Sequence, residues 1–161
     1  AAFKSKSKSI GVLATEGTLS SSLFAKTSAT FAKDVKVIEQ IGSGLVEFIE
    51  SGSLDDPKLS VLLESYIKPM LKQNIDTLVL GCTHYSFLLP QLKKLLPNKV
   101  QIVDSSDAVA IQTLRILEKN NLQSSRKEEG SIQYISSAIE SSLLNFLPKN
   151  TNVSMLPIDP I

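Results

Sequence analysis

Short, mostly apolar runs alternate along this chain with longer segments whose apolar residues recur every three or four positions. The short runs predict strands that are buried on both faces. They lie at residues 10–14, 35–38, 77–81 and 100–103. The longer segments have the spacing of amphipathic helices. They lie at residues 19–32, 42–51, 57–71, 86–96 and 106–120. Regular alternation of the two patterns predicts an α/β fold, in which a parallel sheet of four main strands is flanked by helices.

Capping residues and prolines define the ends of two predicted helices. The sequence Asp-Asp-Pro at 55–57 predicts a helix start, because aspartate accepts from free N–H groups and proline fits the first turn. Pro69 should kink the same helix or remove a bond near its end. Ser106 or Asp107 is expected to cap the helix predicted at 106–120.

The two ends of the chain are expected to be loosely held. Residues 1–8 are basic, rich in serine and begin without methionine, so we expect a flexible linker on a chain that is a fragment or a processed product. A polar loop at 122–130, a weak strand at 132–135 and a helix at 140–147 come later. The tail at 148–161 contains three prolines and is expected to be loose.

Composition narrows the class of protein. A chain of 161 residues suits one ordinary domain, and 42% hydrophobic with 20% charged residues is the balance of a soluble globular protein. The net charge of +1 supplies no field that would attract nucleic acid or an anionic membrane. The apolar stretches are shorter than the roughly 18 residues of a membrane span. A single cysteine forms no internal disulfide, which favours the reducing cytoplasm.

Hydroxyl-rich loops follow three of the predicted strands. They lie at residues 15–18, 81–84 and 104–107, and each opens a predicted helix. In a parallel sheet, the carboxyl ends of the strands meet at one edge. Helix amino termini there offer free N–H groups and partial positive charge. The sequence therefore predicts an anion site, for a carboxylate or a phosphate, at this edge.

Cys82 and His84 are the only cysteine and the only histidine, and both lie in one of these loops. A free cysteine is often only a small buried hydrophobe. Cys82 instead follows a glycine at a strand end, where side chains meet the cleft, and a thiolate there would be stabilised by a helix start or an imidazolium. A protease dyad is geometrically awkward on so short a segment. Two ligands are too few for a metal site, so we expect no metal.

The run Leu-Gly-Cys-Thr-His-Tyr at 80–85 resembles the second-cysteine motif of glutamate racemases. That family usually has proline next, where this chain has Ser86. Three further segments resemble the family and occur in the same order along the chain as in the family. They are residues 11–18, 45–50 with Gly52, and 104–109. The resemblance covers roughly residues 9–147 and implies a lobe of the aspartate/glutamate racemase type.

The resemblance also implies that half of a two-lobed enzyme is absent. The family's Asp-Ser-Gly motif and its Cys-Asn-Thr motif, which bears the first cysteine, do not occur in this sequence. Residues 9–104 are expected to be the second lobe. Residues 105–147 are expected to be a return segment towards a missing N-terminal lobe. Without that lobe, the segment could fold onto this sheet, swap between copies or stay disordered, and a homodimer is a further candidate.

The resemblance implies a cofactor-independent, two-base racemisation of L-glutamate to D-glutamate for peptidoglycan synthesis. Cys82 is expected to be one acid/base, serving the direction from L-glutamate, with His84 orienting or tuning it. Thr83 is expected to hold a substrate carboxylate, and Thr15 and Thr18 either do the same or merely cap a helix. Glu50 either holds His84 or is a solvated glutamate. With one cysteine, the chain alone is expected to be inactive.

Three other functions remain open at this point. The chain could belong to an aspartate or hydantoin racemase, although such relatives usually lack the Cys-Thr-His-Tyr run. It could be a flavodoxin-like anion-binding module in which residues 15–18 cradle a phosphate, which would require no thiol. It could be a regulatory or interaction fragment whose cleft face docks a missing lobe.

Overall fold

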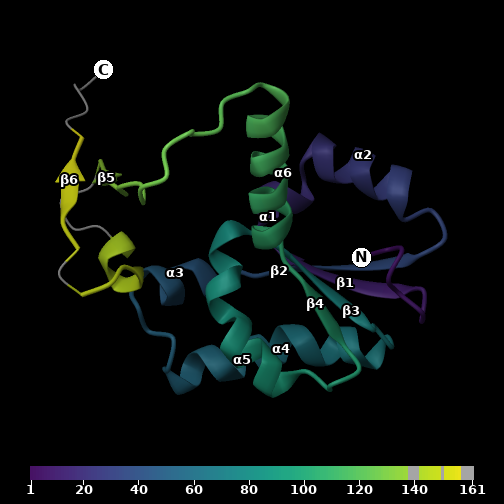
Figure 1. Cartoon of the computed structure of the whole chain (residues 1–161). Helices are drawn as coiled ribbons and strands as arrows, with labels where there is room; N and C mark the ends of the chain where they lie inside the picture. Colours follow the sequence, from purple (N-terminus) through teal and green to yellow (C-terminus); the bar gives the residue numbers. More distant parts are fainter. Residues whose placement is uncertain (138–141, 150, 157–161) are drawn as a thin grey trace.

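A parallel sheet organises the first two thirds of the chain. The computed structural model describes residues 1–137, 142–149 and 151–156. Among these, four parallel strands form the main sheet in the order β2-β1-β3-β4 (Figure 1). They are β1 (Ser9–Ala14), β2 (Lys36–Ile41), β3 (Thr77–Gly81) and β4 (Gln101–Val103). The predicted α/β fold with helices flanking a four-stranded parallel sheet is confirmed.

The helices follow the predicted segments with two corrections. They are α1 (Glu16–Leu19), α2 (Ser22–Phe31), α3 (Leu45–Glu50), α4 (Pro57–Lys72), α5 (Leu89–Leu95) and α6 (Ser106–Lys119), together with the 3₁₀ helix η1 (Thr83–Leu88). The single helix expected at 19–32 was wrong, because the Ser21 hydroxyl accepts from the N–H of Phe24 and starts a separate helix. The helix expected at 86–96 is also divided, since Pro90 lies in the first turn of α5.

Helix α4 begins as predicted. The Asp56 carboxylate accepts from the N–H of Lys58 at 2.8 Å, and Pro57 is the first residue of the helix. The helix continues through Pro69 for one more turn, so the proline removes one hydrogen bond without ending the helix.

The start of α6 differs from the prediction that Ser106 or Asp107 caps it. The carboxylate of Asp104 accepts from the N–H of Ser106 at 2.9 Å, so the side-chain acceptor at the start of α6 is the residue directly after β4. Asp107 lies in the first turn, where its negative charge still favours the helix dipole.

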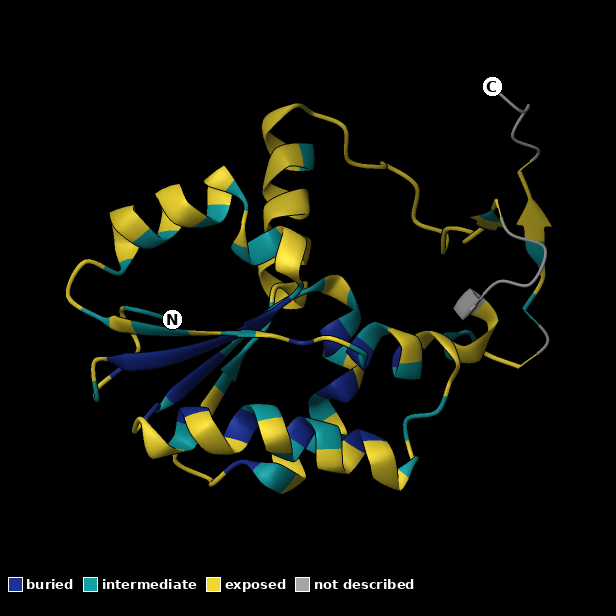
Figure 2. Ribbon diagram, turned by 180° about the vertical axis from the view of Figure 1, so that it is seen from behind, coloured by how far each residue is buried: buried dark blue, intermediate teal, exposed yellow. Residues whose placement is uncertain are grey.

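The core lies on one face of the sheet. Helices α4 and α5 pack there, below the sheet in Figure 1, whereas α2 lies above it and α6 rises from the carboxyl end of β4. The fully buried core residues come from the strands and from α3, α4, α5 and η1. They include Leu13, Leu78, Leu45, Ile49, Leu59, Leu63, Ile67, Met70, Tyr85, Leu88 and Leu92. Neither α2 nor α6, both wholly within the described residues, contains a buried side chain (Figure 2).

The basic start of the chain, expected to be flexible, is held by Asp76. The Asp76 carboxylate accepts from the Ser5 hydroxyl at 2.7 Å and from the N–H groups of Lys6 and Ser7 at 2.6 and 2.7 Å. Burial raises the pKa of Asp76, but these hydrogen bonds and one from Thr77 outweigh it and hold the pKa well below its usual range. Local sequence patterns do not reveal that this one aspartate accepts hydrogen bonds from both a serine hydroxyl and backbone N–H groups.

The C-terminal part folds back instead of forming a fifth strand of the main sheet. Strand β5 (Tyr134–Ser136) pairs in parallel with β6 (Val153–Met155), so the tail expected to be loose contains a strand. The helix expected at 140–147 is a 3₁₀ helix, η2 (Ser142–Phe146), while residues 140 and 141 and the tail beyond 156 lie outside the described residues. Phe146 of η2 packs on Phe87 of η1, with ring centroids 4.0 Å apart.

Candidate functional site

The strand order changes direction between β1 and β3. The chain leaves β1 towards β2 on one side, and β3 and β4 lie on the other side. Loops diverge at such a point, which makes it the usual ligand site of a parallel sheet. The loop after β1 contains Thr15 and Thr18, and the loop after β3 contains Cys82, Thr83 and His84.

Gly81 lets these two loops approach each other. A side-chain carbon at Gly81 would lie 2.6 Å from Cβ of Ala14 and 3.6 Å from Cγ2 of Thr18. The first distance is far inside van der Waals contact, so the approach requires glycine. Sequence reasoning gave Gly81 no role beyond its place at the strand end. The signal that could have revealed it is its position directly before the only cysteine.

Thr15 and Thr18 are paired with each other. Their hydroxyl oxygens are 3.0 Å apart, and the Thr15 hydroxyl also accepts from the N–H of Thr18 at 3.4 Å. Thr15 therefore caps α1, which was the simpler of the two expectations. Both side chains are half-buried beside the β3 loop. A hydroxyl pair of this kind can also donate to an anion, because each hydroxyl has one proton and two lone pairs.

Cys82, His84 and Glu50 form an array of three groups. Sγ of Cys82 lies 4.0 Å from Nδ1 of His84, and Nε2 of His84 lies 3.2 Å from Oε1 of Glu50. The thiol is half-buried, whereas the His84 and Glu50 side chains are 38% and 50% exposed. If Nε2 carries the proton donated to Glu50, Nδ1 is the basic nitrogen that faces the thiol. The array can thus accept a proton near Cys82 and hold a positive imidazolium against a carboxylate.

The loop after β4 lies at the same edge. The hydroxyl oxygens of Ser86 and Ser106 are 3.2 Å apart and connect η1 to the start of α6. Thr83 is exposed at the first position of η1. The structure therefore brings together loops 15–18, 81–84 and 104–107, although Asp104 is engaged in capping α6.

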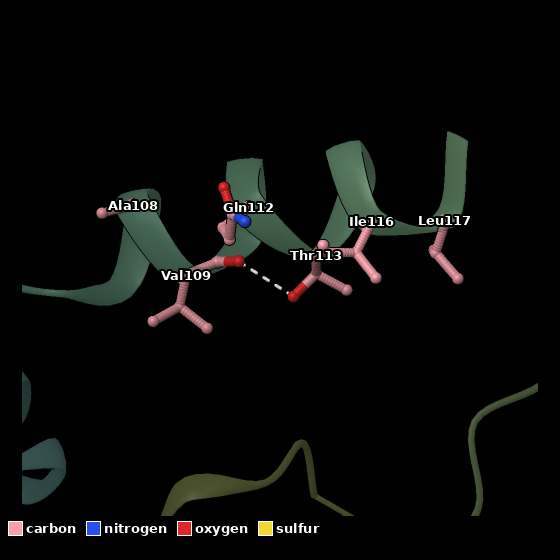
Figure 3. A pocket seen from close by; sticks show the side chains of 6 residues that line it. All are labelled: Ala108, Val109, Gln112, Thr113, Ile116 and Leu117. Atoms are coloured by element: carbon pink, nitrogen blue, oxygen red, sulfur yellow. Dashed lines mark hydrogen bonds between the residues drawn. The ribbon is translucent and has the colours of Figure 1, made fainter. Parts of the chain in front are cut away.

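A separate groove of about 410 Å³ runs along α6. Figure 3 shows its lining, in which the Thr113 hydroxyl donates to the Val109 carbonyl at 2.8 Å. The lining residues are Ala108, Val109, Gln112, Thr113, Ile116 and Leu117. They include no ionisable side chain, and their one hydroxyl is bonded to a backbone carbonyl, so this groove is an apolar helix surface and not a centre for chemistry.

Two negative findings hold for the described part of the chain. Over residues 1–137, 142–149 and 151–156, His, Cys, Asp and Glu do not gather in any group of three or more that could hold a metal ion. In the same residues, every helix is too short or too polar to cross a membrane.

Comparisons with known proteins show which family this chain resembles. The family model for Asp/Glu/Hydantoin racemase matches residues 1–113. A glutamate racemase of Pseudomonas putida F1 is 45% identical over 148 residues, which are 92% of this chain and 56% of the relative. One from Pseudomonas entomophila is 50% identical over 122 residues, 76% of this chain and 46% of the relative. The chain thus spans about half the length of the curated relatives that it matches.

Solved structures show the same similarity. Glutamate racemase isoform RacE1 from Bacillus anthracis superposes with a TM-score of 0.82 at 26% identity, covering 99% of this chain and 60% of that one. The Escherichia coli glutamate racemase, solved with L-glutamate and the activator UDP-MurNAc-ala, superposes with a TM-score of 0.79 at 26% identity. That match covers 96% of this chain and 60% of the E. coli chain.

Proposed function

We propose that this chain, which belongs to the Asp/Glu/Hydantoin racemase family, supplies one of the two acid/base groups of a cofactor-independent glutamate racemase. The observation that carries the proposal is the array of Cys82, His84 and Glu50 near the point between β1 and β3 where the strand order changes direction. The reaction would deliver D-glutamate for peptidoglycan synthesis. A lone free thiol suits the reducing cytoplasm, where we place it.

The proposed step at this site is proton abstraction from the α-carbon of L-glutamate. The Cα–H bond breaks, the Cys82 thiolate becomes a thiol, and the electron pair is delocalised into the α-carboxylate. A second thiol on the opposite face then protonates the carbon, which inverts it. His84 takes the thiol proton at Nδ1 beforehand, and Glu50 stabilises the resulting imidazolium.

The hydroxyls around the thiol are the proposed substrate-binding groups. Thr83 is exposed next to Cys82, and Thr18 of the Thr15–Thr18 pair lies beside Gly81. Donors at both sides of the thiol would orient a substrate carboxylate, so that the α-hydrogen faces Sγ. Orientation of this kind is worth several kcal/mol of barrier, since the reacting atoms must lie about 3–3.5 Å apart.

In this two-thiol mechanism the second thiol comes from outside these 161 residues, because the sequence contains one cysteine. The length of the relatives beyond the matched part leaves room for a front lobe. We propose that residues 9–104 are the second lobe and that 105–147 return towards that front lobe. A homodimer is the competing arrangement, and analytical ultracentrifugation of the chain distinguishes the two.

Substitution of the thiol tests the proposal most directly. In the enzyme that contains both cysteines, Cys82→Ser should lower the rate of glutamate racemisation by at least about 100-fold, since serine is a far weaker acid/base. Glu50→Ala should also slow the reaction, whereas Glu47→Ala on the same helix should not. Near-normal turnover by the Cys82→Ser enzyme would refute the assignment.

The substrate class is tested separately. L-Glutamate, L-aspartate and a hydantoin are offered to the same enzyme, and we expect inversion of glutamate alone. The chain by itself should not interconvert D- and L-glutamate, and at most it should exchange the α-proton of L-glutamate with D₂O. Binding of a nucleotide without any dependence on Cys82 would favour a phosphate-binding module instead.

A further inference from the structure

Helix α3 carries Glu50 but is too short to hold a fixed position by itself. It has six residues, Leu45–Glu50, and Glu50 is the last of them. Isolated helices of this length are unstable in water. Its N-cap is Gly44, which has a positive φ of 80° and no side chain to accept from the free N–H groups. The position of Glu50 beside His84 must therefore depend on contacts with the rest of the chain.

Two tyrosines provide such contacts at the start of α3. The Tyr85 hydroxyl donates to the carbonyl of Gly42 at 3.0 Å, and the Tyr66 hydroxyl donates to the carbonyl of Ser43 at 2.8 Å. Two neighbouring carbonyls of one loop are thus held by phenols from two different elements, η1 and α4. At the other end of α3, the side-chain amide of Asn145 donates to the carbonyl of Glu50 at 2.9 Å.

The contact of Tyr85 with Gly42 is closely fitted. Tyr85 is fully buried, and a side-chain carbon at Gly42 would lie 2.4 Å from its hydroxyl oxygen. Burial, followed by the nearby Cys82 thiol, the Tyr66 phenol and the Glu47 carboxyl, raises the pKa of Tyr85 far above its usual range. The phenol therefore stays protonated and remains a donor at neutral pH.

Tyr85 also belongs to the segment that carries the other members of the array. It follows His84 directly, and its N–H donates to the carbonyl of Cys82 at 3.1 Å. One side chain therefore connects the η1 segment to the loop that precedes α3, and α3 packs against η1. Displacement of this loop would move Glu50 relative to His84, because a six-residue helix moves as one rigid piece.

We propose that Tyr66 and Tyr85, the tyrosine clamp, are positioning residues that set α3, and with it Glu50, against His84. The proposal rests on the proposed function, in which the Glu50–His84 pair supports Cys82. In this proposal the two phenols do not touch the substrate, and their role is to keep Glu50 and His84 together. The chain contains three tyrosines, and the third, Tyr134 in β5, serves as a matched control.

The test uses the 161-residue chain and its single histidine. The carbon-bound ring protons of His84 are recorded by NMR at constant pH in the unchanged chain and in Glu50→Ala, which defines the signal without the pair. In Tyr85→Phe and Tyr66→Phe, we expect the His84 signals to move towards their positions in Glu50→Ala. Tyr134→Phe should leave them unchanged. A merely structural role of the two tyrosines would not move these signals, because the ring would keep its carboxylate partner.

Amide hydrogen exchange measures the clamp independently of any racemase activity. Loss of one hydrogen bond should speed exchange in α3 by about five- to tenfold in each tyrosine variant, while amides of α4 stay unchanged. Unmoved His84 signals in both variants, or equal acceleration in α3 and α4, would overturn the proposal. Tyr66→Phe decides the matter if Tyr85→Phe fails to fold. If the proposed racemase function is refuted but exchange in α3 is accelerated as expected, the clamp remains a positioning device and only its link to racemisation is lost.

Discussion

The helices on the two faces of the sheet bury their apolar side chains to different degrees. Beneath the sheet, α4 and α5 bury an almost continuous apolar layer, with Leu63, Ile67 and Leu92 at 0–1% exposure. Above it, α2 leaves Leu23 74% exposed, and α6 leaves Val109 60% exposed (Figure 2). The amphipathic pattern is present in all four helices, but only α4 and α5 contain fully buried side chains. The helices of the lower face stabilise the chain, whereas the outward apolar side chains of α2 and α6 contribute little to its stability.

The largest expected effect separates the two faces directly. Leu63→Ala removes a fully buried side chain and should lower the free energy of unfolding by about 2–5 kcal/mol, because the cavity fills only in part. Leu23→Ala, the same change on the upper face, should alter it by less than about 0.5 kcal/mol. Urea unfolding followed by circular dichroism measures both. Equal losses would mean that α2 packs as tightly as α4 in solution.

Two glycines extend the comparison from side chains to the backbone. At Gly42, a methyl group would meet the Tyr85 hydroxyl at 2.4 Å and the Leu45 side chain at 2.8 Å, so Gly42→Ala should destabilise the chain by about 1–3 kcal/mol. Around Gly17 in α1, a methyl group would have open space, and Gly17→Ala should stabilise by up to about 1 kcal/mol. Thermal unfolding of both variants checks the opposite signs. A stable Gly42→Ala chain would show that the Tyr85 contact can shift freely.

The strands of the main sheet could be predicted from the sequence to within a few residues. A run of apolar residues such as Ile10–Ala14 is stable in a soluble chain only where both of its faces are covered, which favours a central strand. The exposed position of α6 could not be predicted, since periodicity shows which side of a helix is apolar and not whether a partner is present. The bonds from Ser5 and Ser7 to Asp76 join residues about 70 positions apart, beyond any local pattern.

The candidate site likewise has one part that could be predicted from the sequence and another that could not. The closeness of Cys82 and His84 follows from their spacing of two residues. Glu50 was placed near His84 only by resemblance, and its distance of 3.2 Å depends on how α3 packs on η1. Tyr85 received no role because it precedes the helix predicted at 86–96 and its neighbours in the sequence do not show what its hydroxyl contacts. Only its bond to Gly42, across 43 positions, reveals another task.

The Asp76 contacts hold the start of the chain, and their strength should depend on pH. The folded pKa of Asp76 is lowered, so the unfolded chain binds the proton more readily. The stabilisation is therefore complete above about pH 5 and is lost as the pH falls through the unfolded value of about 3.9 towards the folded one.

Asp76→Asn tests this dependence. It should lower the free energy of unfolding by about 1–2 kcal/mol at pH 7, with a smaller difference from the unchanged chain at pH 3. Asp55→Asn, at an exposed aspartate, provides the control in urea titrations at both pH values. A difference that grows at low pH would have the wrong sign and would exclude this role of the carboxylate. Faster trypsin cleavage after Lys6 in Asp76→Asn would show the release of the segment directly.

The smallest expected effect concerns α6, where the comparison between the faces is sharpest. Leu114 is 50% exposed, and glutamine has a helix propensity close to that of leucine, so Leu114→Gln should change the free energy of unfolding by less than about 0.5 kcal/mol. Urea unfolding is suited to so small a difference when Leu114→Gln and the unchanged chain are measured side by side. A loss of about 2 kcal/mol or more, typical of a buried site, would mean that α6 packs against this chain in solution and that the upper face is complete. A negligible change, combined with a clear loss of stability for the same substitution in the proposed two-lobed enzyme, would show that the apolar side of α6 is buried against the proposed front lobe.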